Sequence, residues 1–333
     1  MTARAGELTR VYNRNWFDAV PDDVTKSADI VRWLNFRKAY AAAAEHSPPA
    51  DFPLQVDIEL TSQCNMTCKF CTHGQINVPK QVLSFRHFCM IIDEGKRHGL
   101  VSIKLNYINE PLLVPDLERY IAYAKSQGVL NVYFATNGLL LDEDYAQRLI
   151  GAGLTKLMVS LDAFSAETFK AIRGNGAFHR VTNNILQFIQ IRNEAGLRFP
   201  LVRVNFLRTS LNWHEYDQFL GYWGPIADMV GFQEQVALPL DFEGEARPPR
   251  RAQETAEKFR CTFPSKQLVV DAWGQILPCC TFSGRLMPMG NIKSTTLAEV
   301  WQGRQMKHLR GVHKQRKITS NPVCANCVGC QHD

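Results

Sequence analysis

Short apolar runs alternate with amphipathic stretches along the chain from residue 54 to residue 236. The apolar runs are rich in Val, Ile, Leu, Tyr and Phe, which is typical of strands buried on both faces of a parallel sheet. The stretches between them carry hydrophobic residues at helical spacing. The pattern predicts six strands, over residues 54–61, 102–108, 131–136, 156–161, 201–207 and 229–236.

Helices are predicted before the first strand and between the others. Ser84 and Ser165 stand where two of them begin, as residues that cap helices do. Repeated strand–helix units form parallel α/β sheets, and a closed barrel of this type needs eight of them. Since this chain offers six, we expect an α/β fold with a partial (β/α)6 barrel. The predicted helices cover residues 27–44, 84–98, 115–127, 142–150, 181–195 and 212–222, with a short helix opening at Ser165.

The last part of the chain departs from this pattern. Residues 239–251 combine prolines with charges of both signs, which predicts a linker that we place at 239–258. Beyond the linker, a hairpin that turns at Trp273 and Gly274 and a helix over 296–310 indicate a small second domain. We therefore divide the chain into a helical preamble at 1–53, a barrel at 54–238, the linker, and a small C-terminal domain at 259–333.

Composition and charge exclude several classes of protein. The chain has 333 residues, of which 45% are hydrophobic and 21% charged, as is ordinary for a globular protein. No apolar run reaches the roughly 18 residues that span a bilayer, and the first residues lack the apolar core of a signal peptide. The net charge of +6 is mild and dispersed, so it does not indicate nucleic acid as a partner. We expect a cytoplasmic protein with no membrane partner.

The ten cysteines carry the main chemical signal. In a reducing compartment, clustered cysteines indicate a metal site and not disulfides. Cys64, Cys68 and Cys71 follow the first predicted strand, at the strand end where α/β barrels place their chemistry. Three thiolates on one short loop suit a cubane iron–sulfur cluster with one iron left open. A zinc site that also uses His73 is the alternative.

This C-x3-C-x2-C motif after the first strand of a six-unit barrel resembles the radical S-adenosylmethionine (SAM) superfamily. The resemblance implies that Cys64, Cys68 and Cys71 hold a [4Fe–4S] cluster whose remaining iron chelates SAM. Reduction by an external donor such as flavodoxin or ferredoxin would cleave SAM to a 5′-deoxyadenosyl radical, which abstracts a hydrogen atom from the substrate.

The resemblance extends to the ends of the next three predicted strands. The second ends in Asn109 and Glu110, where the family usually has Gly-Gly-Glu-Pro, and the third ends in Thr-Asn-Gly around Asn137. Ser160 ends the fourth strand and Arg173 follows it. The resemblance implies that Asn109 and Glu110 meet the SAM amino group and that Asn137 belongs to the cofactor site. It also implies that Ser160 and Arg173 clamp the SAM carboxylate, for which a guanidinium is well suited.

A second group of cysteines lies in the C-terminal part. On spacing alone, thiolates separated by a hairpin and a loop hold either zinc or a second cluster. A pattern of Cys, twelve residues, Gly, four residues and Cys also resembles the SPASM/twitch domain of radical SAM enzymes, which carries auxiliary [4Fe–4S] clusters. The cysteines suffice for one auxiliary cluster, held by the first two and by two of the last three, and structural zinc is the alternative. The candidate ligands are Cys261, Cys279, Cys324, Cys327 and Cys330.

Two cysteines fall outside these ligand sets. Cys280 adjoins a candidate ligand and is a candidate hydrogen-atom donor to a substrate radical, as thiols are in radical epimerases. The competing interpretation is a small buried hydrophobe. Cys89 lies between Phe88 and Met90 on a predicted helix and is interpreted as a core residue.

Three functions are compatible with these features. We expect a radical SAM oxidoreductase or epimerase that acts on a small polar substrate such as a sugar or aminocyclitol. Polar residues on the fifth and sixth strands, among them Arg203, Asn205 and Gln233, favour a hydroxylated or charged substrate, although a buried hydrogen-bond network competes with this interpretation. Radical modification of a ribosomally made peptide or protein is the second possibility, and the short preamble counts against it. A non-catalytic iron–sulfur or zinc protein is the third.

Overall fold

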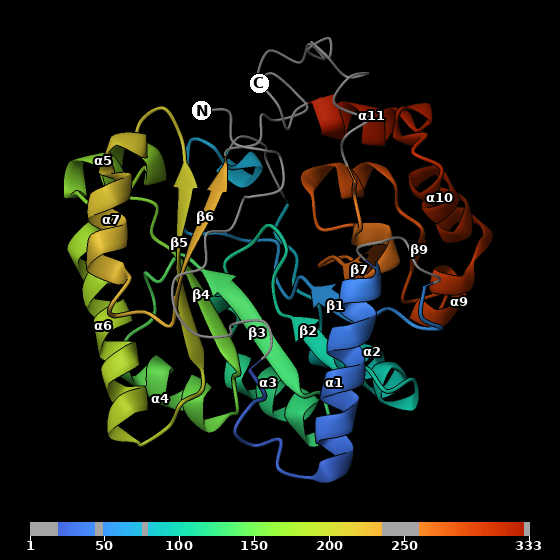
Figure 1. Ribbon diagram of the computed structural model, residues 1–333, viewed down its shortest axis with the longest axis horizontal. Coiled ribbons are helices and arrows are strands. Elements are labelled where there is room, and N and C mark those ends of the chain that lie inside the picture. Colours follow the sequence, from blue (N-terminus) through green and yellow to red (C-terminus); the bar gives the residue numbers. More distant parts are fainter. Residues whose placement is uncertain (1–18, 44–48, 75–78, 235–259, 330–333) are drawn as a thin grey trace.

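One nine-stranded sheet forms the centre of the computed structural model, which describes residues 19–43, 49–74, 79–234 and 260–329 (Figure 1). The strands are β1 (Gln55–Ile58), β2 (Ser102–Lys104), β3 (Asn131–Thr136), β4 (Lys156–Ser160), β5 (Leu201–Arg208), β6 (Met229–Glu234), β7 (Gln267–Val270), β8 (Gln275–Leu277) and β9 (Gly290–Asn291). They lie in the order β6-β5-β4-β3-β2-β1-β7-β8-β9. The first six pair in parallel, β7 pairs in parallel with β1, and β8 and β9 continue antiparallel.

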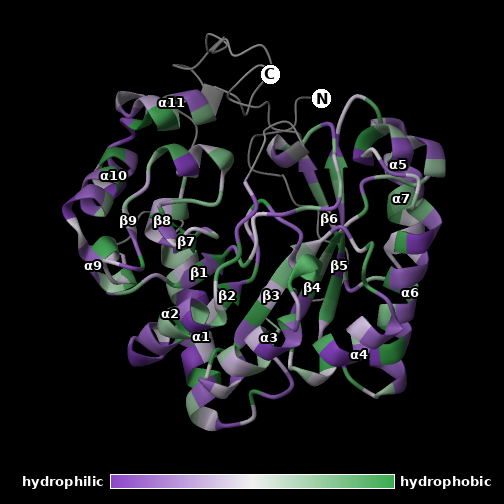
Figure 2. Cartoon of the chain, turned by 180° about the vertical axis from the view of Figure 1, so that it is seen from behind, coloured by the Kyte–Doolittle hydropathy of each residue, from purple (hydrophilic) through white to green (hydrophobic). Residues whose placement is uncertain are grey.

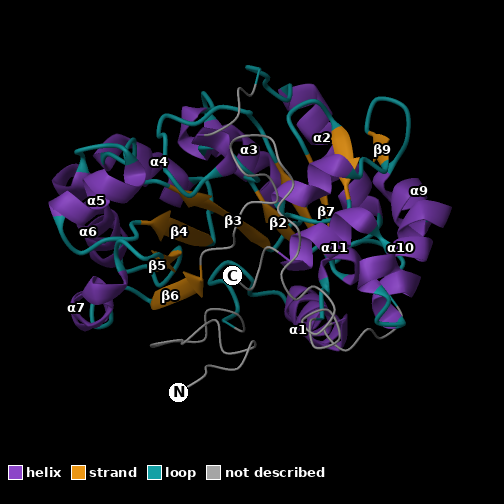
Figure 3. Ribbon diagram, turned by 90° about the horizontal axis from the view of Figure 1, so that it is seen from above, coloured by secondary structure: helices purple, strands orange, loops and turns teal. Residues whose placement is uncertain are grey.

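This arrangement confirms the predicted α/β partial barrel. All six predicted parallel strands are present, and β3 has the predicted bounds. Seen from above, the strands form an arc with helices on its outer side (Figure 3). The final residues of the sixth predicted strand and the whole predicted linker at 239–258 lie outside the described residues.

The outer helices begin and end close to the predicted positions. The side chains of Ser84, Asp142 and Ser165 each accept a hydrogen bond from a backbone N–H of the first turn, which fixes three of the starts. None of the described helices is both long and apolar enough to cross a membrane. The helices flanking the first six strands are α1 (Ser27–Ala42), α2 (Phe85–Arg97), α3 (Leu117–Ser126), α4 (Glu143–Gly151), α5 (Ala166–Arg173), α6 (Phe178–Glu194) and α7 (Tyr216–Trp223).

The two faces of the sheet have different chemistry, because side chains alternate along each strand. On β5, Val202, Val204 and Phe206 are fully buried in the apolar core that the sheet shares with the outer helices. Arg203 and Asn205 face the concave interior instead. The colouring by hydropathy shows this layering, with hydrophobic strands inside and hydrophilic surfaces on the helices around them (Figure 2). The concave interior therefore carries polar side chains such as those of Arg203 and Asn205.

Helix α1 covers part of that concave side (Figures 1 and 3). Its Trp33 is fully buried, and the Lys156 Nζ of β4 lies 5.4 Å from the centre of the Trp33 ring. The N-terminal helix thus closes the interior near the start of the parallel strands. Their carboxyl ends carry the loops described below.

The C-terminal part is attached to the barrel through the sheet and through side chains. Because β7 pairs with β1, the hairpin predicted at Trp273 and Gly274 extends the barrel sheet. Arg285 donates two hydrogen bonds of 2.8–2.9 Å to the buried carboxylate of Glu59. The carboxylate of Glu94 on α2 accepts hydrogen bonds from two backbone N–H groups of the first turn of α9 (Leu297–Gln302).

Two features of this part differ from the predicted elements. The single helix predicted at 296–310 is two helices, α9 and α10 (Arg304–Lys314), because the backbone of Gly303 is extended. A further helix, α11 (Pro322–Gly329), occupies the tail that carried no helix prediction. Cys324 and Cys327 are three residues apart on α11, so they share one face of the helix.

Candidate functional site

The loop after β1 carries the first three cysteines to the carboxyl ends of the parallel strands. Its end is held against α5, because the N–H of Lys69 donates to the carbonyl of Ile172 at 3.0 Å. Gly174 follows α5 with φ of +68°, and a Cβ there would lie 2.8 Å from the Thr67 hydroxyl oxygen. Glycine at this position therefore lets the cysteine loop pack directly on the end of α5.

The structure brings together all the residues predicted for the first cluster and for SAM. They line one cavity of about 230 Å³ at the mouth of the partial barrel. The cavity is also lined by Asn205 and Gln233, which were candidates for contact with a polar substrate, and by Tyr107, which had no predicted role. The predicted residues that line it are Cys64, Cys68, Cys71, Asn109, Glu110, Asn137, Ser160 and Arg173.

The chemistry of the three thiols suits a polynuclear cluster. Burial raises the pKa of Cys64 to about 11, and it also raises the pKa of Cys68, opposed by the nearby Arg173. Thiols in such surroundings become thiolates when a metal takes the proton's place. Within the described ranges, no three His, Cys, Asp or Glu side chains are grouped closely enough to bind a single metal ion. His73, the remaining donor of the zinc alternative, holds the backbone carbonyl of Ser62 at 2.8 Å.

Glu110 organises the cavity through its side chain. Its carboxylate accepts hydrogen bonds from the N–H of Leu112 at 3.0 Å, the hydroxyl of Thr136 at 2.6 Å and the N–H of Asn137 at 2.7 Å. Its own N–H donates to the carbonyl of Gln63, just before the cysteine loop. Glu110 therefore joins the cysteine loop to the ends of two strands, and both its carboxylate oxygens are already used inside the protein.

Arg173 stands between the cysteine loop and the strand ends. Its guanidinium forms an ion pair with the buried Asp162 and lies 3.5 Å from the sulfur of Cys68. Its Nε has no hydrogen-bond partner although it is buried. The Nδ2 of Asn109 and the Oδ1 of Asn205 are likewise buried without a partner, and both residues line the cavity. Buried polar atoms are nearly always satisfied, so these three atoms indicate a polar ligand.

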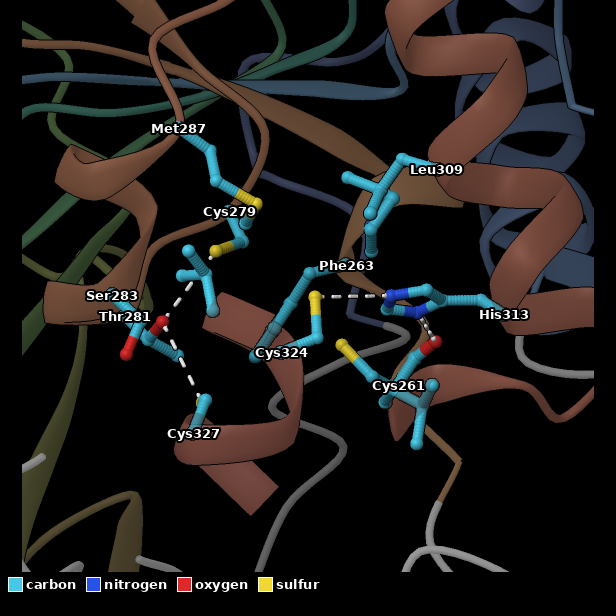
Figure 4. Close-up of a pocket in the computed structure, with 13 residues that line it drawn as sticks. Cys261, Phe263, Cys279, Thr281, Ser283, Met287, Leu309, His313, Cys324 and Cys327 are labelled. Atoms are coloured by element: carbon cyan, nitrogen blue, oxygen red, sulfur yellow. Dashed lines mark hydrogen bonds between the residues drawn. The ribbon is translucent and has the colours of Figure 1, made fainter. Parts of the chain in front are cut away.

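Four cysteines of the C-terminal part surround a second, apolar cavity (Figure 4). One precedes β7, one follows β8, and two lie on α11. Burial raises the pKa of the Cys324 thiol to about 12 and raises that of Cys279 as well. Two of the three terminal cysteines belong to this group, and the third, Cys330, lies outside the described residues. The four are Cys261, Cys279, Cys324 and Cys327.

Two polar residues of the second cavity carried no prediction from sequence. The ring nitrogens of His313 on α10 lie 3.2 Å from the carbonyl of Cys261 and 3.5 Å from the sulfur of Cys324 (Figure 4). The hydroxyl of Thr281 lies 3.4 Å from the sulfur of Cys279. Their positions depend on the folding of distant segments, and no spacing rule in the sequence connects them.

Cys280 and Cys89 are not among the residues that line the two cavities. Cys280 packs with Tyr107, Val269 and Leu277 on the barrel side of the hairpin, and it does not line either cavity. Cys89 is half-buried on α2. Tyr107 itself connects the two cavities, because it lines the first and its hydroxyl donates to the carbonyl of Thr281, which lines the second.

Comparison with known families decides what the cysteines serve. Residues 58–199 match the family model described as the Radical SAM superfamily. The protein belongs to the radical SAM superfamily. Residues 261–328 match the SPASM model, described as an iron-sulfur cluster-binding domain. The radical SAM domain takes a [4Fe–4S] cluster together with SAM, and the SPASM domain takes auxiliary iron–sulfur.

Individual relatives match parts of this radical SAM chain. A probable GTP 3′,8-cyclase of Methanococcus maripaludis is 31% identical over 182 residues, which are 54% of this chain and 59% of the relative. The chain thus spans little more than half the length of that curated relative. Two solved structures share the fold. BtrN in complex with AdoMet and 2-DOIA has a TM-score of 0.51 at 19% identity and covers 82% of this chain and 91% of its own. Streptococcus suis SuiB bound to S-adenosylmethionine has a TM-score of 0.60 at 15% identity, and the match covers 90% of this chain and 78% of the SuiB chain.

Proposed function

We propose that this radical SAM enzyme abstracts a hydrogen atom from a small polar substrate bound in the concave interior, and that the product is the oxidised substrate. The observation that carries the proposal is the unpartnered buried Oδ1 of Asn205, which lines the same cavity as the cysteine loop. A hydroxyl or another hydrogen-bond donor of a small ligand would satisfy it. The relatives named as GTP 3′,8-cyclases and the BtrN complex with 2-DOIA support a small substrate.

The residues of the first cavity divide the work of binding. Cys64, Cys68 and Cys71 would hold the [4Fe–4S] cluster, which would supply the electron for reductive cleavage of SAM. We propose that Ser160 and Arg173 hold the SAM carboxylate, since the Nε–H of Arg173 is unused and the Nη1 of the same guanidinium lies 3.5 Å from the sulfur of Cys68. Glu110 acts as a positioning residue, because both oxygens of its carboxylate already accept hydrogen bonds from other parts of the protein.

Oxidation is favoured over epimerisation by the connection between the two cavities. After a hydrogen atom has left, oxidation of the substrate requires a further electron and a proton to leave. Tyr107 lines the first cavity and bonds to Thr281 of the second, so the auxiliary cysteines lie one bridging residue away. We propose Cys261, Cys279, Cys324 and Cys327 as the auxiliary ligands. Cys280, the candidate hydrogen donor of an epimerase, does not line the first cavity.

Product analysis in D2O tests this function. The anaerobically reconstituted enzyme, SAM and a reductant are incubated with a panel of sugars, polyols and aminocyclitols, and 5′-deoxyadenosine and products are measured by mass spectrometry. We expect 5′-deoxyadenosine together with a product that lacks two hydrogen atoms and carries no solvent deuterium on carbon. An isomer of the substrate that carries one deuterium would instead assign epimerisation.

A matched variant separates enzyme chemistry from background. Cys68→Ala should form no 5′-deoxyadenosine, because one of the three loop thiolates is missing. Equal amounts from the wild type and from Cys68→Ala would overturn radical chemistry at this site. Stimulation by peptides alone would replace the small substrate by the peptide alternative, for which SuiB bound to its precursor peptide SuiA is a structural precedent of the fold.

A further inference from the structure

Arg203 is an unusual residue for the interior of a parallel sheet. It lies on β5 and only 8% of its surface is exposed. Side chains alternate along the strand, so Arg203 shares the concave side with Asn205 and Leu207, which both line the first cavity. A charged side chain buried there needs a reason, because moving an ion out of water is strongly unfavourable.

The neighbouring strand makes room for the guanidinium. In the register of β5 and β6, Arg203 stands opposite Met229, and Asn205 stands opposite Gly231. A Cβ built on Gly231 would lie 2.0 Å from the Arg203 Nε, 2.1 Å from its Nη2 and 2.3 Å from its Cζ. The side chain therefore crosses to β6 and leans toward the carboxyl end, onto the one residue that has no side chain. Its guanidinium thereby reaches the level of Asn205, which lines the cavity at the barrel mouth, whereas Arg203 itself is not among the lining residues.

This guanidinium has no counterion within the described residues. Two other buried arginines have counterions, since Arg173 and Arg192 pair with Asp162 and Asp228. Arg310 donates to a backbone carbonyl, and one nitrogen each of Arg173 and Arg310 is also without a partner. The Arg203 Nε has no hydrogen-bond partner, and no acidic side chain in the described part of the chain forms an ion pair with it. Burial lowers its pKa to about 10, so it remains a cation at neutral pH.

We propose that Arg203 binds an anionic group of the substrate, a phosphate or a carboxylate, with Asn205 and Gln233 beside it to receive polar groups of the same molecule. The inference rests on the proposed function and narrows its substrate class from polar to anionic. A planar guanidinium offers paired donors that match both oxyanions, and an anion would supply the missing counterion. Gly231 then has a defined role, since it creates the space in which the guanidinium lies.

Anion binding to the SAM-loaded holoenzyme tests the inference. Inorganic phosphate and acetate are titrated separately, at constant ionic strength against chloride, and heat or the thermal midpoint is recorded. SAM is kept saturating so that Arg173 is occupied. We expect the wild type to bind at least one of the two anions, and Arg203→Met to bind it at least about tenfold more weakly. The anion that binds tells whether phosphate or carboxylate is the substrate group.

Three further variants make the result specific. Arg203→Lys keeps the charge but not the paired donors, so it should fall between wild type and Arg203→Met. Gly231→Ala places a methyl group on the guanidinium and should weaken anion binding as Arg203→Met does. Arg180→Met, on the exposed side of α6, is the matched control and should bind anions like the wild type. The visible spectrum of the clusters confirms that each variant is folded.

Three outcomes would overturn the inference. The first is that the wild type binds neither phosphate nor acetate more strongly than chloride. The second is that the wild type and Arg203→Met bind the anion equally well. The third is that Arg203→Met loses SAM affinity and anion affinity to the same extent, which would assign Arg203 to the SAM carboxylate. Formation of 5′-deoxyadenosine is measured on the same wild-type sample. Its absence would remove the proposed function while leaving the anion result interpretable.

Discussion

Replacing Glu110 by glutamine tests the idea that this residue builds the cavity without touching the cofactor. In the wild type, the N–H of Asn137 donates to the Glu110 carboxylate at 2.7 Å. A glutamine oxygen can still accept from Leu112 and Thr136, but its amide nitrogen then faces the N–H of Asn137. In the variant, two hydrogen-bond donors therefore face each other. The side chain of Asn137 in turn donates to Asn65 of the cysteine loop at 2.7 Å, so the disturbance reaches the cluster site.

The size of the effect follows from that one reversed contact. A hydrogen bond to a charged group contributes about 1.5–3 kcal/mol, and a buried donor left unsatisfied costs about 1–3 kcal/mol. Burial raises the pKa of Glu110, which shows that its charge is itself penalised, and glutamine relieves that penalty. We therefore expect Glu110→Gln to lose about 2–3 kcal/mol of stability and about 2–5 °C in thermal midpoint. Displacement of the cysteine loop should weaken SAM binding about tenfold.

The assay is thermal unfolding together with equilibrium SAM binding, both on the reconstituted protein. Glu167→Gln, an exposed residue in the first turn of α5, removes the same charge and should cost less than about 1 kcal/mol. Wild-type stability and wild-type SAM affinity in Glu110→Gln would refute the reasoning. A loss of SAM affinity without any loss of stability would show that Glu110 contacts SAM directly.

Three other predictions address residues around the two cavities. Burial raises the pKa of Glu59 from 4.5 to about 7, against the opposing charge of Arg285. Between these two pKa values, the folded protein keeps a proton that the unfolded chain releases. As the pH rises from 5 to 8, the free energy of unfolding of the wild type should therefore fall by about 3 kcal/mol relative to that of Glu59→Gln. A difference in thermal midpoint between the two proteins that stays constant over this range would contradict the prediction. Asp162→Asn leaves the buried Arg173 without its counterion and should cost about 3–5 kcal/mol, and an unfolding midpoint like that of the wild type would exclude a structural role for the pair. Cys280→Ala should still give the oxidised product, whereas cleavage of SAM with no product would restore Cys280 as a hydrogen donor.

The parallel strands and most helices were predictable because their signals are local. Apolar runs such as 131–136 and capping residues such as Ser84 carry the information within a few residues. The break at Gly303 was not predicted, because glycine is also tolerated within helices and neighbouring residues keep the helical pattern. Helix α11 was missed because its eight residues show only weak amphipathic character next to the cysteines.

The site was predictable where its residues belong to one motif and not where they meet across the fold. The cysteine loop meets Asn109 and Ser160 in one cavity because parallel strands end at the same edge of the sheet, and Arg173 reaches the same cavity from the end of α5. The guanidinium of Arg203 over Gly231 depends on strand register and on the absence of one side chain, which sequence spacing does not encode. The use of the Glu110 carboxylate inside the protein depends on backbone N–H groups that only the folded loops bring together.

Counting iron and acid-labile sulfide per chain after anaerobic reconstitution tests the central claim most directly. The proteins compared are the wild type, a variant with Cys64, Cys68 and Cys71 replaced by Ala, and a variant with the cysteines of the second cavity replaced by Ala. Two [4Fe–4S] sites predict about eight irons in the wild type and about four in each variant. About four irons in the wild type, falling to none when the loop cysteines are replaced while zinc is retained, would make the second cavity a structural zinc site and contradict the account of oxidation.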